Sequence, residues 1–287
     1  KIKVWRPDII HETYYSALPT FRTNAIRVTS VYDMIHELFG AQFSNGDKTT
    51  HRKKITFDRV DHIVSISHST KRDLIKMLDV DESKISVVHL GVDLQKFTKD
   101  KVDVNFSPES YILFVGSRGG YKNFHGFLKA CAASNVIKNR ILIIAFGGGR
   151  FSRSEESIIS SLGFSDGFVV QVSGSDDILA SLYASAICLV YPSLYEGFGL
   201  PPLEAMAAKC PVVSSNASSM PEVINDAGIY FDPNSVEEMR LAIESVIEDV
   251  TLRAKLILLG LENIKKFSWE KCAGETLSVY ENLIGKS

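Results

Sequence analysis

The chain has 287 residues, of which 45% are hydrophobic and 23% charged, a composition typical of globular proteins. Its 32 basic and 34 acidic residues leave a net charge of −2, which argues against a nucleic-acid partner held by overall charge. No apolar run approaches the roughly 20 residues that cross a bilayer, and no signal peptide is visible. The four cysteines stand far apart in apolar contexts, which favours reduced core thiols in a cytoplasmic protein; they are Cys131, Cys188, Cys210 and Cys272.

Strand-like apolar runs alternate with helix-like runs along the chain, which predicts an α/β fold with parallel sheets covered by helices. The expected strands lie at residues 9–10, 25–29, 62–67, 84–88, 111–115, 140–146, 168–172, 187–191 and 212–214. The expected helices lie at residues 50–60, 70–78, 124–133, 152–162, 176–185, 201–209, 236–248, 251–267 and 269–284. Capping signatures at Ser69 and Ser235 support two of the helix starts.

A polar stretch at residues 98–110, poor in large apolar groups, predicts a linker. It separates a first α/β domain at residues 1–97 from a second at residues 110–267. The sequence has no initiator Met and opens inside what looks like a βα unit, so we expect the first domain to be partial.

The stretch at residues 191–209, YPSLYEGFGLPPLEAMAAK, reads as a strand end, a tight loop and a helix. Gly197 and Gly199 allow a sharp turn and close approach to a ligand, and the prolines after them suit a first helical turn. Free N–H groups at that helix start favour an anion. Glu196 and Glu204 bracket the loop. On this pattern alone, a plain corner of an α/β sheet with surface carboxylates is an equal alternative.

The nine residues EGFGLPPLE resemble the E-x7-E element of retaining glycosyltransferases of family 4, which have the GT-B fold. The resemblance implies two Rossmann-like α/β/α domains facing a cleft, with helix 269–285 packing back on the first. It implies that Glu196 contacts the donor sugar and Glu204 the nucleotide ribose. The loop amides would contact the sugar and phosphates; they belong to Gly197, Phe198, Gly199 and Leu200.

A second stretch, FVGSRGGYKN at residues 114–123, is similar to the G-x-R-x-x-x-K element of the same family. The resemblance implies that Gly116 lies beside the donor and that Arg118 and Lys122 bind its diphosphate. The chemistry agrees, because breaking a glycosyl–phosphate bond puts negative charge on the leaving phosphate, and fixed cations stabilise that charge. A solvated basic turn is the ordinary alternative.

Two further turns resemble nucleotide contacts of the family. Gly147, in the triple glycine after the strand at 140–146, matches a second glycine-rich turn, and Val172 and Ser173 match the position that holds the base. Both patterns are equally compatible with plain turns. The adjacent Asp176 and Asp177 lack the D-x-D spacing of metal-dependent sugar transfer, so we expect no metal.

The segment RVTSVYDMIHE at residues 27–37 resembles the active-site segment of the first domain. Many family members read T-V-H-D here, with the His near the transferred sugar. This chain has Tyr32 in place of that His, followed by Asp33, so a catalytic His is not implied, whereas Asp33 keeps a catalytic place and Tyr32 a donor contact. His36 and Glu37 read as ordinary loop residues, and His11, a lone His after a strand, reads more readily as structural than catalytic.

A basic run at residues 51–54, HRKK, begins a helix of the first domain. It reads either as a solvated helix face or as a contact with an anionic membrane or lipid-phosphate acceptor. The second reading predicts a cytoplasmic protein that lies peripherally on the inner membrane.

Taken together, the resemblance implies a retaining, metal-independent hexosyltransferase without a cofactor. It would move a sugar from a nucleoside-diphosphate donor, GDP-mannose first, to a saccharide or lipid-linked acceptor. Two alternatives stay open from the sequence: another GT-B enzyme such as a sugar-nucleotide epimerase, and a non-catalytic nucleotide-sugar-binding or scaffold fragment.

Overall fold

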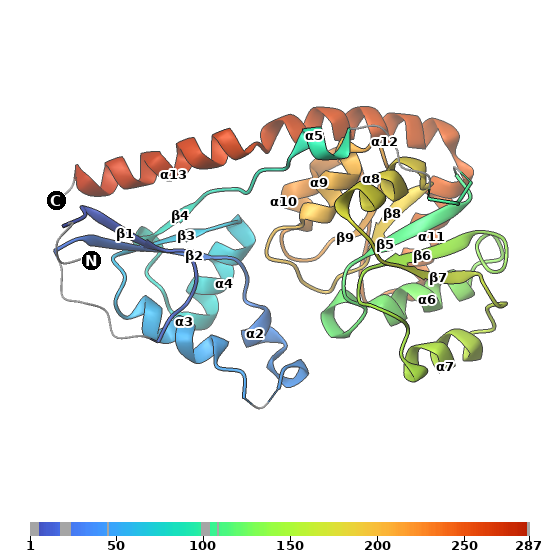
Figure 1. Cartoon of the computed structure of the whole chain (residues 1–287), viewed down its shortest axis with the longest axis horizontal. Coiled ribbons are helices and arrows are strands. Elements are labelled where there is room, and N and C mark those ends of the chain that lie inside the picture. The colour runs from blue at the N-terminus through green and yellow to red at the C-terminus, as the bar shows by residue number, and fades with distance from the viewer. Residues whose placement is uncertain (1–5, 18–23, 45, 99–103, 108, 286–287) are drawn as a thin grey trace. The chain divides into compact units, whose positions relative to one another are not determined.

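A computed structural model describes residues 6–17, 24–44, 46–98, 104–107 and 109–285 of the chain. The chain divides into two compact units, each with its own sheet (Figure 1). Residues 1–91 with 267–287 form the first unit, and residues 92–266 form the second. Part of the expected linker, at 99–103 and 108, lies outside the described residues.

The first unit has a four-stranded parallel sheet in the order β1-β2-β3-β4. Its strands are β1 (Ile9–Glu12), β2 (Ile26–Val31), β3 (His62–Ser65) and β4 (Ile85–Val87). Its helices are α2 (Ile35–Leu38), α3 (Thr49–Phe57), α4 (His68–Leu78) and α13 (Trp269–Ile284), with 3-10 turns η1 (Gly40–Gln42) and η2 (Glu82–Lys84).

The core of the first unit lies between one face of this sheet and α13. Val28 and Val64, on adjacent strands, and Val88 after β4 are all buried. The half-buried side chains of α13 that pack on them are Cys272, Val279, Tyr280 and Leu283. The turn into α13 also passes close to Gly91, where a Cβ atom would lie 2.3 Å from the backbone nitrogen of Trp269, so only glycine fits.

Helix α4 begins earlier than the sequence predicts. Its N-cap is Ser67, whose hydroxyl accepts a hydrogen bond from the Thr70 N–H at 3.0 Å. The expected cap, Ser69, is instead a buried residue within the first turn. Two serines two residues apart offer the same local signature, and the end of β3 decides which of them precedes the helix.

The second unit has a six-stranded parallel sheet in the order β10-β9-β8-β5-β6-β7. The strands are β5 (Tyr111–Val115), β6 (Leu142–Phe146), β7 (Val169–Val172), β8 (Cys188–Tyr191), β9 (Val212–Ser215) and β10 (Gly228–Phe231). The helices are α5 (Leu94–Phe97), α6 (Phe124–Ala132), α7 (Arg153–Ser161), α8 (Asp176–Ser185), α9 (Leu200–Ala207), α10 (Met220–Ile224), α11 (Val236–Glu248) and α12 (Val250–Asn263). The 3-10 turns are η3 (Gly120–Lys122), η4 (Asn225–Ala227) and η5 (Ile264–Lys266).

Both faces of the six-stranded sheet are covered, as the unbroken apolar runs of its central strands require. Ile112 and Phe114 of β5 belong to the core cluster that α6 and α11 complete. The side chain of Tyr111, the first residue of β5, points to the other face, where its hydroxyl donates to the carbonyl oxygen of Leu182 in α8 at 2.7 Å. Two helical layers therefore hold the strand ends in place.

The segment at residues 92–97, which the sequence assigned to the first domain, groups with the second unit. Its helix α5 contacts α8 and α9, and the buried Phe97 lies against the Tyr183 ring with centroids 6.0 Å apart. Burial of an aromatic side chain on another element outweighs sequence proximity in deciding to which unit a short helix belongs.

Candidate functional site

Four turns of the second unit leave the carboxyl ends of adjacent strands, and we call them the donor turns. They are residues 116–122 after β5, 147–149 after β6, 172–175 at the end of β7 and 196–199 after β8. The chain runs from β5 outward to β7, then crosses back to β8 on the other side of β5. Strand order therefore reverses between β5 and β8, and ligands of open α/β sheets bind outside the carboxyl ends of the strands at such a point.

Glu196 and Lys122 form an ion pair across this reversal point. The Nζ atom of Lys122 lies 2.7 Å from Oε1 of Glu196. The side chain of Lys122 is 14% exposed and that of Glu196 is 9% exposed. Lys122 Nζ also lies 3.4 Å from the hydroxyl of Tyr191 and over the rings of Tyr191 and Tyr121. A cation and a carboxylate separated by 74 residues in the sequence thus meet at the ends of β5 and β8.

The loop at 196–199 is held by a neighbouring turn that the sequence analysis did not single out. Glu196 N–H donates to the Ser218 hydroxyl at 2.8 Å. The buried Ser219 hydroxyl lies 2.9 Å from the carbonyl oxygen of Glu196 and 2.8 Å from that of Phe198. Gly199 adopts a φ of 109°, and a Cβ atom there would lie 2.5 Å from Cε of Met220. Side-chain bonds to both ends therefore fix the loop conformation.

Glu204 lies on α9 and faces Tyr183 of α8. The Tyr183 hydroxyl donates to Oε2 of Glu204 at 3.1 Å. Burial raises the pKa of Glu204, and neighbouring Asp176 raises it further, against the opposing effects of Tyr183 and Lys96. Asp176 itself is ion-paired with Lys96. Ser175 is the N-cap residue of α8, and its side chain makes no capping hydrogen bond.

Arg118 is enclosed by the turns that it connects, with only 3% of its side chain exposed. Its Nη1 donates to the carbonyl oxygen of Gly147 at 2.6 Å, and its Nε to Oε1 of Glu155 at 2.6 Å. Arg118 and Lys122 therefore stand in different surroundings, although the sequence predicts one role for both.

The remaining donor turns lie side by side. Gly147 N–H donates to the carbonyl oxygen of Val172 at 3.1 Å, and Gly116 N–H to that of Phe146 at 3.0 Å. The Ser173 hydroxyl accepts from the side-chain amide of Gln171 at 2.6 Å. Among the predicted donor residues the structure thus joins Gly116, Gly147 and Val172 through one layer of backbone contacts.

Tyr32 and Asp33 belong to the first unit, whereas the donor turns belong to the second. Oδ1 of Asp33 accepts from the Ile35 N–H at 3.0 Å, and its side chain is 30% exposed. Tyr32 N–H lies 3.4 Å from the hydroxyl of Tyr15, and burial raises the pKa of Tyr15. The Tyr32–Asp33 segment is therefore anchored at the carboxyl end of β2.

Lys53 corrects the reading of the basic run at 51–54 as a solvated face. Its side chain is 1% exposed and its Nζ lies 2.7 Å from Oε2 of Glu37 and 2.7 Å from the carbonyl oxygen of Asp33. Glu37, read as an ordinary loop residue, is 4% exposed. The other three residues of the run, His51, Arg52 and Lys54, are exposed.

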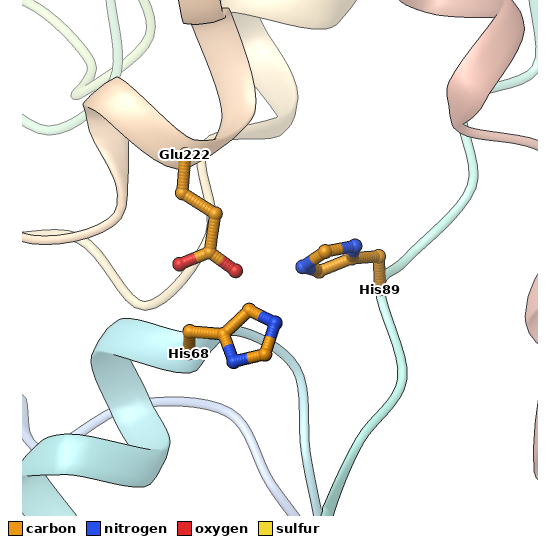
Figure 2. Close-up of side chains that lie close together, drawn as sticks. All are labelled: His68, His89 and Glu222. Carbon is orange, nitrogen blue, oxygen red and sulfur yellow. The ribbon is translucent and has the colours of Figure 1, made fainter.

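Three histidines of the first unit, His11, His68 and His89, have partners within that unit. His11 bonds the hydroxyl of Tyr280 through Nδ1 and that of Ser30 through Nε2, and burial lowers its pKa. Figure 2 shows His68, the first residue of α4, and His89, which follows β4; their rings form an edge contact with centroids 5.8 Å apart. The third side chain drawn there, Glu222, belongs to the second unit.

Residues whose contacts the sequence did not predict include Glu155, Ser218, Ser219 and Lys53. A capping signature, Ser152 followed by Glu155, was present for one of them. No local pattern marks the other three, since their partners lie 16 to 23 residues away. Among the described residues, no helix combines the length and apolar character needed to cross a bilayer.

Comparison with known proteins places both units of the chain among glycosyltransferase families. The sequence profile described as "Glycosyl transferases group 1" matches residues 96–260, and that of "Glycosyltransferase Family 4" matches residues 1–96. The chain is 29% identical over 252 residues to O-antigen chain mannosyltransferase B of Escherichia coli, covering 83% of the chain and 65% of that protein. It is 32% identical over 193 residues to O-antigen chain mannosyltransferase RfbU of Salmonella typhimurium, covering 67% of the chain and 53% of that protein.

A solved structure shows the same fold. The glycosyltransferase from Rickettsia africae superposes with a TM-score of 0.76 at 20% identity, covering all of this chain and 79% of that one. The α/β fold is therefore of the GT-B type. The alignments span less than two thirds of the two mannosyltransferases. Because a group 1 profile covers more than half of its residues, the chain belongs to the glycosyl transferases group 1 family.

Proposed function

We propose that this chain binds a nucleoside-diphosphate sugar on its second unit and serves a glycosyltransferase reaction. The reaction transfers a hexose to a saccharide or lipid-linked acceptor, with retention and without a metal. The observation that carries the proposal is the Lys122–Glu196 pair, which joins the ends of β5 and β8 where the strand order reverses. A cation beside a carboxylate at this point suits a phosphate next to a sugar.

Lys122 supplies the charge that a departing diphosphate needs. As the glycosyl–phosphate bond lengthens, negative charge grows on the phosphate oxygens, and a fixed cation stabilises this state more than the ground state. The ammonium has three N–H donors and can bond a phosphate oxygen while keeping Glu196 at 2.7 Å. Glu196 in turn accepts from sugar hydroxyls and orients the ring.

Glu204 and the other donor turns bind the nucleotide. Glu204 already holds one donor, the Tyr183 hydroxyl, and accepts ribose hydroxyls with its remaining capacity. Val172 and Ser173 line the base, and the amides of the 116 and 147 turns and of Gly197, Phe198, Gly199 and Leu200 meet the diphosphate and sugar. The amino end of α9 adds a favourable dipole for the anion.

The first unit provides the acceptor side. Asp33 and Tyr32 face the transferred sugar in this proposal, and the exposed His51, Arg52 and Lys54 of α3 approach the anionic surface of a membrane. Mannose is the first candidate sugar, because the two relatives described above are named as mannosyltransferases. GDP-mannose is therefore the first donor to test.

A donor screen tests the proposal directly. Purified protein is melted with GDP-mannose, UDP-glucose and ADP-glucose, and the bound donor raises the melting temperature by mass action. Lys122→Ala should abolish the shift, whereas Lys129→Ala, on the exposed side of α6, should retain it. Protein that responds to no nucleotide sugar would contradict donor binding.

Chemistry is tested on the longest natural form of the protein. Its product from GDP-mannose and a saccharide acceptor should keep the donor's anomeric configuration in NMR spectra, with an unchanged rate in EDTA. Inversion would overturn retention, and loss of activity in EDTA would overturn metal independence. C2 epimerisation without transfer would overturn the transferase reaction. Binding without any turnover would leave a nucleotide-sugar-binding protein instead of an enzyme.

A further inference from the structure

The turns after β5 and β6 approach each other through bare backbone. Gly116 and Gly147 have φ values of 134° and 95°, and a Cβ atom on Gly147 would lie 3.2 Å from the carbonyl oxygen of Gly116. Glycines in such conformations lose much conformational entropy on folding, so something must hold the turns in one geometry. The second turn has no side chains of its own to do this, because it is a triple glycine.

Arg118 supplies the connection. Its Nη1 donates to the carbonyl oxygen of Gly147 at 2.6 Å, and its Nη2 lies 3.3 Å from that of Gly148 and 3.1 Å from that of Arg150. Its guanidinium lies 4.8 Å from the centre of the Phe151 ring. A Cβ atom on Gly148 would come within 2.7 Å of Nη1, so glycine at this position leaves room for the guanidinium.

Glu155 holds the other edge of the guanidinium. Its Oε1 accepts from Arg118 Nε at 2.6 Å, and its Oε2 lies 3.4 Å from Nη2. The same carboxylate closes the capping box of α7, where the Ser152 N–H and hydroxyl both lie 2.7 Å from Oε2. Partial burial favours a raised pKa, but the bonds from Arg118 and Ser152 outweigh it and hold the pKa of Glu155 at about 2.

We propose that Glu155 and Arg118 are positioning residues for the donor diphosphate, an inference that rests on the proposed function. Glu155 orients Arg118, and Arg118 fixes the 147–150 turn against the 116–120 turn so that backbone N–H groups of these turns, other than those of Gly116 and Gly147, converge on the phosphates. Lys122 is the cation that touches the diphosphate. All three guanidinium nitrogens of Arg118 already donate within this cluster, which commits most of its five N–H donors to protein acceptors.

The decisive experiment compares nucleotide affinity between wild type and three variants. Calorimetry with GDP, and in parallel UDP, is run on wild type, Glu155→Gln, Arg118→Lys and the double variant. Glu155→Gln should weaken binding about fivefold or more, the scale of effects transmitted through one set of contacts. Affinity for the nucleoside, which lacks phosphates, should not change. The double variant should bind no more weakly than Arg118→Lys alone, because Glu155 acts through Arg118.

A direct diphosphate contact by Arg118 predicts the opposite sign. Releasing the guanidinium from Glu155 would then leave affinity unchanged or raise it, and that result would overturn the proposal. Two matched variants separate the pair from its surroundings: Ser152→Ala removes the α7 cap and keeps the Arg118 pair, and Glu156→Gln removes an exposed carboxylate one residue along. An equal loss of GDP affinity in Ser152→Ala would show that Glu155 acts only by capping α7. An equal loss in Glu156→Gln would show that it acts only through its negative charge, and either result would overturn the proposal.

Hydrogen exchange gives a readout that does not depend on ligand. In unliganded protein, Glu155→Gln should speed exchange of the amides at 147–150 while Ser152→Ala leaves it unchanged, at equal melting temperature. Equal exchange in both variants would overturn the proposal. If wild type bound neither GDP nor UDP, the proposed donor function would fall, and the exchange comparison would still decide whether the Arg118–Glu155 pair fixes the turns.

Discussion

Lys53 and Glu37 form an ion pair inside the first unit, with side chains only 1% and 4% exposed. Lys53 also donates to the carbonyl oxygen of Asp33 at 2.7 Å, so the pair supports the segment after β2. Among the described residues, Oε1 of Glu37 has no hydrogen-bond partner. A buried charge left without its counter-ion is costly, because neither water nor protein then compensates it.

Replacing Lys53 should therefore be far more damaging than replacing its neighbour. We expect Lys53→Ala to lower the free energy of unfolding by about 3 kcal/mol, and Lys54→Ala, on the exposed side of α3, to change it by under about 0.5 kcal/mol. The double variant Lys53→Met/Glu37→Leu should lose less than Lys53→Ala. Urea denaturation measures all three, and equal losses for Lys53→Ala and Lys54→Ala would contradict the burial of this pair.

Glu204 should carry a pH-dependent part of nucleotide binding. Burial raises its pKa, so its carboxylate form is lost earlier than usual as the pH falls. Because only the carboxylate accepts two ribose hydroxyls, affinity for GDP should decline as the pH falls from neutral towards the raised pKa of Glu204. Glu204→Ala should cost about 1.5–3 kcal/mol of binding at the upper pH. It should also flatten the pH profile.

Calorimetry across that range is the measurement, with Glu248→Ala, an exposed residue at the end of α11, as the matched variant. The sign for folding is opposite. A carboxyl group whose pKa is raised in the folded state contributes stability below its unfolded pKa that is lost as the pH rises through the folded pKa. A Glu204→Ala variant with unchanged GDP affinity would remove this residue from the binding site.

At the scale of elements, the conformation of the 196–199 loop and the start of α9 are fixed together. Gly199 is the N-cap of α9 and has a φ of 109°, while Ser218 and Ser219 bond the loop at Glu196 and Phe198. Two elements adjacent in the sheet, β8 and β9, thus set the loop through their following turns. These hydrogen bonds hold the 196–199 loop in one conformation without a ligand, and such preorganisation reduces the entropy cost of binding.

Gly199→Ala tests that rigidity. The substituted residue would be strained at this φ and its Cβ would meet Met220, so we expect the free energy of unfolding to fall by about 1–3 kcal/mol. Affinity for GDP should fall with it. Gly119→Ala is the comparison for stability, because Gly119 has a φ of −87° and a Cβ atom there would meet no other atom within 4 Å. Equal unfolding curves for the two variants would show that Gly199 tolerates a side chain.

At the scale of the whole molecule, the order of segments along the chain does not decide to which unit a segment belongs. Helix α13 comes last in the sequence but groups with the first unit, where Tyr280 bonds His11 and Val279 packs on the Val28 cluster. All six strands of the second sheet lie within residues 92–266. Donor binding and the integrity of the first unit are therefore expected to be separable.

Deleting residues 268–287 should expose that separation. The first unit loses the helix that covers one face of its sheet, so hydrogen exchange should rise in β1 to β4. GDP affinity should remain close to that of wild type, because every proposed nucleotide contact lies on the second unit. Calorimetry and exchange on the same preparation provide both readings. Loss of GDP binding with a still-protected second unit would show that α13 takes part in the site.

The sequence by itself determined the class of fold and the family, because both follow from local patterns. Apolar runs alternating with amphipathic ones predicted two parallel sheets, and EGFGLPPLE with FVGSRGGYKN identified the family; both predictions are confirmed. Strand β10 was missed, since its four residues begin with glycine and only one of them is buried. So short a run has no periodicity to distinguish it from a loop.

Only the tertiary structure decided which charged groups are paired. Lys53 and Lys54 are neighbours of the same type, yet one is buried and the other exposed. Arg118 and Lys122 belong to one motif, yet Arg118 pairs with Glu155, 37 residues on, and Lys122 with Glu196, 74 residues on. The physical reason is that periodicity records which face of an element is buried, whereas an ion pair depends on where parallel strands end relative to one another.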